Sequence, residues 1–188
     1  MNSVEALERL LKGNARFASG RVQAPRREAE RRFETAGGQF PYAVILTCSD
    51  SRVPPEIIFD EGIGDLFVVR VAGNVTDDLV TGSIEYAALH LSVPLVVVLG
   101  HNNCGAVNAA CSEGSPGGHT GSFIDAIRPV INRSAGFEGD DFVDANVRYV
   151  VETLKDSEPV LKPLVDEGQL SILGAHYDLN SGKVSLVD

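Results

Sequence analysis

The sequence predicts an α/β fold in which a small, mostly parallel β-sheet is flanked by helices. Three segments, 42–48, 66–71 and 95–100, are almost continuously apolar, which is typical of strands buried on both faces of a parallel sheet. Helical patterns separate them, as the crossovers between parallel strands require. With 188 residues, 44% of them hydrophobic, the chain is long enough for one domain with a substantial core. We expect a single domain over residues 1–188, with about four parallel strands and a C-terminal edge strand.

The N-terminal part is predicted to be a helical arm over residues 1–36. Apolar residues recur at helical spacing over 3–17, with Asn2 or Ser3 as the cap. An arginine-rich stretch containing Pro25 follows. We expect this arm to be solvated or to contact a second subunit, and the alternative is an anion-binding patch. The arginines are Arg16, Arg21, Arg26, Arg27, Arg31 and Arg32.

The remaining elements follow from the same periodicities. Asp77 or Asp78 is expected to cap a helix that runs to about Leu91 and has one apolar stripe. Residues 112–121 form a predicted Gly/Ser/Pro loop, and 180–182 a turn between the last two strands. The other predicted helices span 104–112, 122–133, 141–156 and 159–167, and the last two strands span 170–177 and 183–187.

Composition excludes several functional classes. A net charge of -10 argues against binding to nucleic acids or to anionic membranes. No apolar run is long enough to cross a bilayer, and the N-terminus lacks the pattern of a secretory signal, so we expect a cytoplasmic protein. The three cysteines include no C-x-x-C pair, and in a reducing compartment such cysteines more often bind metal or do chemistry than form disulfides.

Soft metal ligands follow two of the predicted strands. The segment 48–52, Cys-Ser-Asp-Ser-Arg, follows the first strand, and the segment 101–105, His-Asn-Asn-Cys-Gly, follows the third. Ligands of such sheets lie beyond the carboxyl ends of the strands, so the two segments are expected to meet there. Two thiolates, an imidazole and a carboxylate suit one tetrahedral zinc ion. The four predicted ligands are Cys48, Asp50, His101 and Cys104.

The spacing within each segment agrees with one shared ion. Cys48 and Asp50 are two residues apart in extended chain, so both can face one side. His101 and Cys104 are three apart, as on a first helical turn, and a helix N-terminus favours the thiolate of Cys104. Cys111 has no comparable partners and is expected to be a buried free thiol.

The ligand set favours a catalytic site over a structural one. Structural zinc is usually enclosed by four Cys or His ligands, whereas here the fourth ligand is a carboxylate. Asp50 either fills the fourth position or leaves it to pair with Arg52, which admits water. The residues leave both arrangements open.

These segments resemble those of the β-class carbonic anhydrases, and the similarity covers nearly the whole chain. Besides 48–52 and 101–105, it is carried by the segments 64–70, 72–74 and 83–87. The resemblance implies one zinc per subunit, held by Cys48, His101 and Cys104, and reversible hydration of carbon dioxide to bicarbonate and a proton by zinc-bound hydroxide. It also implies that an Asp50–Arg52 dyad orients the hydroxide and gates access to zinc.

The resemblance further implies a substrate pocket and an oligomer. Gln39 matches a glutamine that hydrogen-bonds substrate, Phe67 and Tyr86 match residues that line the apolar pocket, and Gly105 offers a backbone N–H near substrate. The expected assembly is a homodimer or a dimer-based higher oligomer, with Gln39 and Tyr86 acting across the subunit interface. Some bacterial members bind a regulatory bicarbonate beside a tryptophan; Ile45 stands at that position, so no such regulation is expected.

Three alternatives share these residues. The same zinc site can attack carbon disulfide or carbonyl sulfide in place of carbon dioxide. A closed zinc site would instead make the chain a structural or scaffold protein. A thiol redox enzyme is disfavoured, because no resolving cysteine lies near either ligand cysteine.

Overall fold

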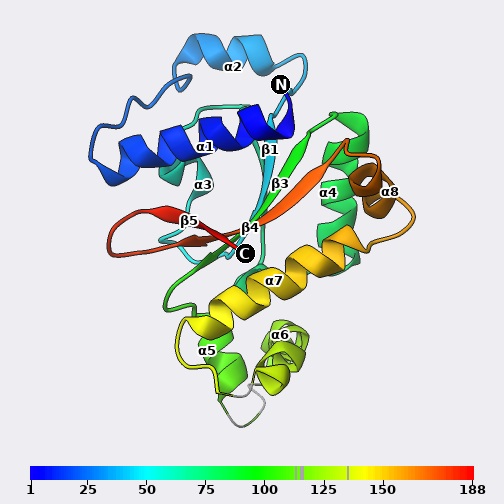
Figure 1. Cartoon of the computed structure of the whole chain (residues 1–188). Coiled ribbons are helices and arrows are strands. Elements are labelled where there is room, and N and C mark those ends of the chain that lie inside the picture. Colours follow the sequence, from blue (N-terminus) through cyan, green and yellow to red (C-terminus); the bar gives the residue numbers. More distant parts are fainter. Residues whose placement is uncertain (113, 115–116, 135) are drawn as a thin grey trace.

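The computed structural model describes residues 1–112, 114, 117–134 and 136–188. The strands form a five-stranded sheet in the order β2-β1-β3-β4-β5 (Figure 1). The first four are parallel, and β5 pairs antiparallel with β4 at the edge, which confirms the predicted fold class. The strands are β1 Ala43–Thr47, β2 Leu66–Arg70, β3 Leu95–His101, β4 Ser171–Tyr177 and β5 Val184–Val187.

The helices that the sequence predicts are present, with boundaries shifted by one or two residues. Asn2 and Glu5 form a reciprocal capping box at the start of α1, and Asp77 caps α4 by accepting a hydrogen bond from Val80 N–H. The sequence patterns do not predict α3 or the bounds of α2 within the arm. The helices are α1 Ser3–Ala18, α2 Ala29–Thr35, α3 Pro55–Ile58, α4 Asp78–His90, α5 Gly105–Cys111, α6 Gly121–Arg133, α7 Asp141–Lys155 and α8 Leu161–Asp166.

Two short 3₁₀ turns complete the described elements. One, Ala72–Asn74, follows β2, and the other, Gly118–Thr120, precedes α6. The loop predicted over 112–121 lies partly outside the described residues, and its last three described positions before Gly121 form the second turn.

Both faces of the sheet are covered, which explains why its central strands, β1 and β3, are apolar up to their last residues, Thr47 and His101. Successive residues of β1 face opposite sides: Val44 and Leu46 pack with α4, α7 and α8, whereas Ala43 and Ile45 pack with α1 and α3. Every residue of β1 and β3 is buried. Glycine permits the close approach of α7, because a Cβ on Gly100 would lie 2.6 Å from a methyl group of Val147.

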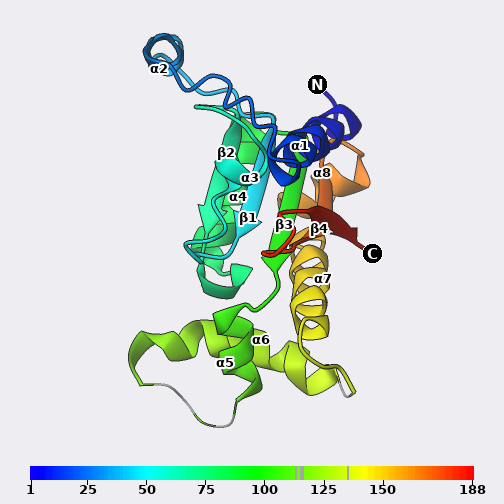
Figure 2. The ribbon, with the colours of Figure 1, turned by 90° about the vertical axis from the view of Figure 1, so that its left-hand side faces the viewer.

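A third apolar cluster lies beyond the carboxyl ends of the strands. The helices α5 and α6 pack together there, away from the two sheet faces (Figure 2). Cys48 and Cys104 belong to this cluster, together with Ile127 and Val143 from α6 and α7. The ends of β1 and β3 therefore meet the packed helices α5 and α6. The segments 48–52 and 101–105 lie where the sheet joins these helices.

Buried carboxylates bind the arginines of the N-terminal arm. Glu61 is 1% exposed and accepts hydrogen bonds from Arg9, Arg26 and the Tyr42 hydroxyl at 2.5 to 3.0 Å. The neighbouring carboxylates pair in the same way, Asp60 with Arg16 and Asp65 with Arg9, Arg26 and Arg31. These arginines thus bind the arm to carboxylates of its own chain. From the sequence alone, they are expected to be solvated, to contact a second subunit or to bind an anion.

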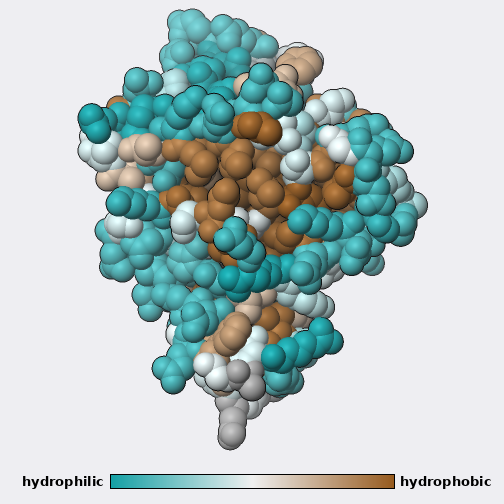
Figure 3. Space-filling model, in the orientation of Figure 1, coloured by the Kyte–Doolittle hydropathy of each residue, from teal (hydrophilic) through white to brown (hydrophobic). Residues whose placement is uncertain are grey.

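The surface carries large apolar side chains at several places. A broad apolar area lies between α1 and α7 in the view of Figure 3. The arm helix α2 stands apart from the body in Figure 2, and none of its residues is buried. Among the described residues, no helix combines the length and the apolarity needed to cross a membrane.

We predict that Glu61→Gln lowers the free energy of unfolding by about 2 to 3 kcal/mol, because it leaves the partly buried Arg9 and Arg26 with Asp65 as their one remaining carboxylate partner among the described residues. The estimate lies at or below the lower end of the range for buried pairs, since Arg9 and Arg26 are 31% and 36% exposed. Glu8→Gln is the matched control: Glu8 forms an exposed pair with Lys12, so its effect should stay below about 0.5 kcal/mol. Urea unfolding of the two variants measures both effects, and equal stability would contradict a central role for Glu61.

Candidate metal centre

The sheet topology brings the two predicted segments to one edge. The strands β1 and β3 are parallel neighbours, with Thr47 opposite Leu99, so the residues that follow them emerge side by side. Cys48 follows β1 directly, and His101 is the last residue of β3. Cys104 precedes the first residue of α5 and serves as its N-cap. The prediction that both segments meet beyond the carboxyl ends of the strands is confirmed.

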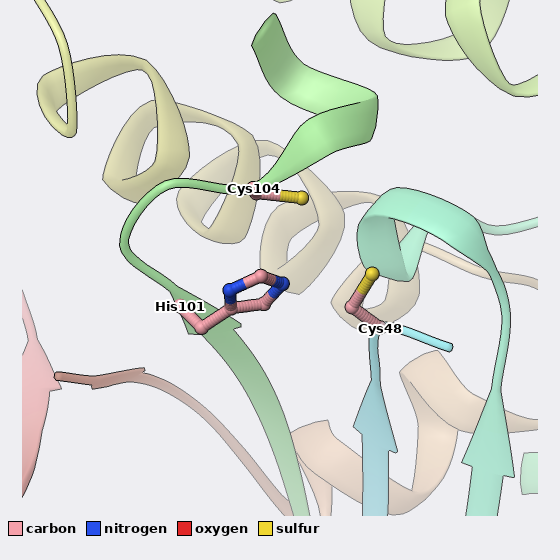
Figure 4. Close-up of side chains that lie close together, drawn as sticks. All are labelled: Cys48, His101 and Cys104. Atoms are coloured by element: carbon pink, nitrogen blue, oxygen red, sulfur yellow. The ribbon is translucent and has the colours of Figure 1, made fainter. Parts of the chain in front are cut away.

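Three of the predicted ligands form a compact cluster. The Sγ atoms of Cys48 and Cys104 and a ring nitrogen of His101 all lie within 4.8 Å of one another. The side chains point toward a common space (Figure 4), and they are 5%, 1% and 0% exposed, respectively. The residues could hold a metal ion, because thiolate and imidazole are the ligands that zinc prefers in proteins.

The imidazole of His101 is oriented for such a role. Its Nδ1 lies 2.9 Å from the carbonyl oxygen of Asn102, and because a carbonyl can only accept, Nδ1 carries the proton. The lone pair is then on Nε2, which is fully buried and has no hydrogen-bond partner in the described part of the chain. Metal-binding histidines usually donate their second ring N–H in this way, and an unpaired buried nitrogen is costly without a ligand.

The hydrogen bond between the two thiols shifts their pKa values in opposite directions. A hydrogen bond from the Cys104 thiol, together with the Gly73 N–H, outweighs burial and lowers the pKa of Cys48. The same bond and burial raise the pKa of Cys104, so the second proton is held tightly. A bound cation would compensate the charge of two thiolates.

Asp50 pairs with Arg52 and lies outside the three-residue cluster. The Arg52 guanidinium donates to both carboxylate oxygens, at 2.9 and 2.7 Å, and the Arg52 backbone N–H donates to Oδ1 at 2.9 Å. These bonds hold the pKa of Asp50 well below its usual range. Asp50 Oδ2 is 3.9 Å from His101 Nε2, so the carboxylate borders the cluster. Of the two arrangements that the sequence leaves open, the structure shows the Asp50–Arg52 pair.

Arg70 is a site residue that sequence reasoning missed. From the end of β2, its guanidinium donates to the carbonyl oxygens of Cys48 and Asp50 at 3.0 and 2.6 Å. It thus fixes the backbone that carries a cluster residue and the adjacent carboxylate. Only its register opposite Thr47 hints at this contact, because the acceptors are main-chain groups.

The predicted substrate-binding residues lie in different places. Gly105 is the exposed first residue of α5, next to Cys104. Phe67 and Tyr86 contact each other with ring centroids 6.3 Å apart, but Phe67 is level with Val44, about 13 Å along the strands from Cys48. Gln39 precedes the opposite end of β1 and is exposed. Within one chain, the structure brings only Gly105 to the cluster.

The third cysteine does not match its prediction. Cys111 is exposed, although a buried thiol was expected. It is the last residue of α5, and Ala106, Val107 and Ala110 supply the buried face of that helix. The apolar character of the cysteine side chain is therefore not enough to predict whether Cys111 is buried.

Comparisons with known proteins point to one family. The family model described as carbonic anhydrase matches residues 43–184. Carbonic anhydrase 2 of Mycobacterium tuberculosis is 44% identical over 194 residues, which cover 100% of this chain and 94% of that protein. The chain belongs to the β-class carbonic anhydrases.

Further similarities agree with this assignment to the β-class carbonic anhydrases. A carbonic anhydrase of Mycolicibacterium smegmatis is 42% identical over 98% of this chain and 93% of that protein. A tetrameric β-carbonic anhydrase from Sordaria macrospora superimposes with a TM-score of 0.78 at 30% identity, over 85% of this chain and 87% of that chain. The resemblance found in the sequence motifs is thus confirmed.

We predict that Asp144→Asn lowers the pKa of His176 toward its ordinary value. Asp144 Oδ1 lies 2.7 Å from His176 Nδ1, and this hydrogen bond raises the pKa of His176, with smaller contributions from Asp140 and Asp178. Because the pKa is raised in the folded state, the pair stabilises the protein below the unfolded pKa of about 6.5, and the stabilisation is lost as pH rises through the folded pKa.

An NMR titration of the imidazole protons measures this pKa directly. Asp125→Asn, an exposed carboxylate on α6, is the matched control and should leave the His176 titration unchanged. The stability difference between wild type and Asp144→Asn should be larger near about pH 5 than near about pH 9. Identical His176 titrations in wild type and Asp144→Asn would show that the pair does not form in solution.

Proposed function

We propose that the protein catalyses the reversible hydration of carbon dioxide to bicarbonate and a proton at one zinc ion per chain. The observation that carries the proposal is the convergence of Cys48, His101 and Cys104, with a buried Nε2 on His101 that has no partner among the described residues. Family membership supplies the reaction class. We place the reaction in the cytoplasm, where the two buried thiols stay reduced.

The donor set fits zinc with a coordination position to spare. Two thiolates and one imidazole make three protein ligands, the number found in catalytic rather than structural zinc sites. The Asp50 carboxylate borders the cluster, 3.9 Å from His101 Nε2, and so is the nearest candidate for interaction with a fourth ligand. Zinc bound by the three residues would acidify a water at that position and so supply the nucleophile.

Asp50 and Arg52 position the attacking water in this proposal. With zinc and water bound, Asp50 would accept a hydrogen bond from the water and so orient it for attack on the substrate. Arg52 keeps the carboxylate ionised and away from the cluster, since it donates to both of its oxygens. Release of Asp50 by Arg52 would let the carboxylate take the fourth position, which closes the site to water.

We further propose that a second copy of the chain completes the substrate pocket. Gln39 and Phe67 lie too far along β1 and β2 to reach the cluster of their own chain, so they serve a site only across an interface. Exposed apolar side chains and the open edge of β2 provide the surface for such a contact. Exposed apolar side chains that precede β1 or belong to α4 include Phe33, Phe40, Leu79, Tyr86 and Leu89.

The first test combines metal analysis with a hydration assay. Purified, reduced protein should contain one zinc per chain and hydrate carbon dioxide, and parallel assays with carbonyl sulfide and carbon disulfide separate the alternative substrates. Asp50→Asn should keep zinc and the fold but lose turnover by about 100-fold or more, because it removes the ionised acceptor. The matched control is Asp166→Asn, which removes an exposed carboxylate on α8 and should keep full activity. Protein that lacks zinc, or an Asp50→Asn variant with wild-type turnover, would overturn the proposal.

The second test concerns assembly. Light scattering should give a mass of at least two chains, each of 20.0 kDa. Replacing Phe33 and Phe40 with serine should shift the protein toward a single chain, because these side chains are 79% and 88% exposed within one chain. Phe137→Ser, in the segment between α6 and α7, is the control and should not change the mass. A wild-type protein that stays monomeric at high concentration would contradict the shared pocket.

A further inference from the structure

A glycine peptide donates a hydrogen bond to one of the cluster thiols. The N–H of Gly73 lies 3.4 Å from Cys48 Sγ in the buried part of the site. A hydrogen bond to a thiolate stabilises its charge and reduces the electron density that it gives to a metal. The direction of this N–H therefore matters for any ion that Cys48 binds.

The conformation of Gly73 sets that direction. Gly73 has a φ of 72°, in the left-handed region, and a Cβ at this position would lie 2.6 Å from Ile127 Cδ1 and 3.1 Å from Ala106 Cβ. The turn is closed by a hydrogen bond from Asn74 N–H to the carbonyl oxygen of Val71 at 3.0 Å. Glycine is required here, but its conformational freedom also means that a further contact must hold its backbone in this conformation.

Asn146 of α7 makes a hydrogen bond that fixes the backbone of Gly73. Its Nδ2 donates to the carbonyl oxygen of Gly73 at 2.9 Å, and the residue is 1% exposed. Neighbouring positions on the buried side of the helix are apolar, among them Val143, Val147 and Val150. Asn146 Oδ1 has no hydrogen-bond partner among the described residues. A buried amide with one unpaired atom costs stability, so packing alone would favour an apolar residue.

We infer that Asn146 is a positioning residue: by binding the carbonyl of the Gly73–Asn74 peptide, it holds Gly73 in the conformation in which its own N–H, on the preceding peptide, is directed at Cys48 Sγ. The link runs from α7 through the two peptide units that meet at Gly73 to a cluster residue, and Asn146 makes no contact with substrate. The inference rests on the proposed zinc site and assigns to it a supporting side chain from a helix outside both motifs.

The test compares metal binding with stability. Asn146→Leu and Asn146→Ala both remove the donor, but leucine fills the space and alanine does not. Both should weaken zinc binding about tenfold, measured by competition with a chromophoric chelator, whatever their effects on stability. In cobalt-substituted protein, both should also shift the thiolate-to-cobalt charge-transfer band, which reports on the sulfur directly.

Val151→Ala is the control, because it truncates another buried side chain on the same helix. It should lower stability but leave zinc affinity and the cobalt band at wild-type values. Wild-type affinity and an unshifted band in both Asn146 variants would overturn the inference while the zinc site stands. An equal loss of affinity in Val151→Ala would overturn it too, since destabilisation would then explain the effect. A wild-type protein without zinc affinity would overturn the proposed function and this inference together.

Discussion

The parallel pairing of β1 with β3 is the constraint on which the site depends. The two motifs are separated by about fifty residues of chain, and only adjacent strands in matched register deliver Cys48 and His101 to one point. Both strands are wholly buried, so a slip in register would be opposed by the packing of two helical layers. The core therefore does more than stabilise the fold: it fixes the relative position of side chains that bear the chemistry.

Much of the fold follows from the sequence because local signals agree with tertiary packing. The helices α4 and α7 each bury an apolar face, Asp77 caps α4, and β1 and β3 are apolar up to their last residues. The short helices escape prediction for physical reasons. No residue of α2 is buried, so it has no apolar period, and α3 is a single turn that begins at Pro55. The arginines of the arm also mislead, since their partners are carboxylates thirty or more residues away.

The sequence predicts only part of the site, because some of its side chains bind main-chain atoms rather than a metal or another side chain. Ligand types and strand ends suffice to bring together Cys48, His101 and Cys104, and spacing alone suggests that Arg52 pairs with Asp50. Arg70 and Asn146 could not be found in this way, because each binds main-chain carbonyls that have no sequence signature. The resemblance names Gln39 and Phe67 as substrate-binding residues, but the sheet of one chain places both away from the cluster.

The separate packing of α5 and α6 has a consequence for dynamics. His101 ends a strand of the sheet, whereas Cys104 enters the helical unit below it, so the cluster spans the seam between two cooperative parts of the fold. A cation bound by all three side chains would act as a cross-link, and opening the seam would require breaking a metal–ligand bond. Occupancy of the centre should then slow amide hydrogen exchange throughout α5 and α6, including positions that touch neither metal nor substrate.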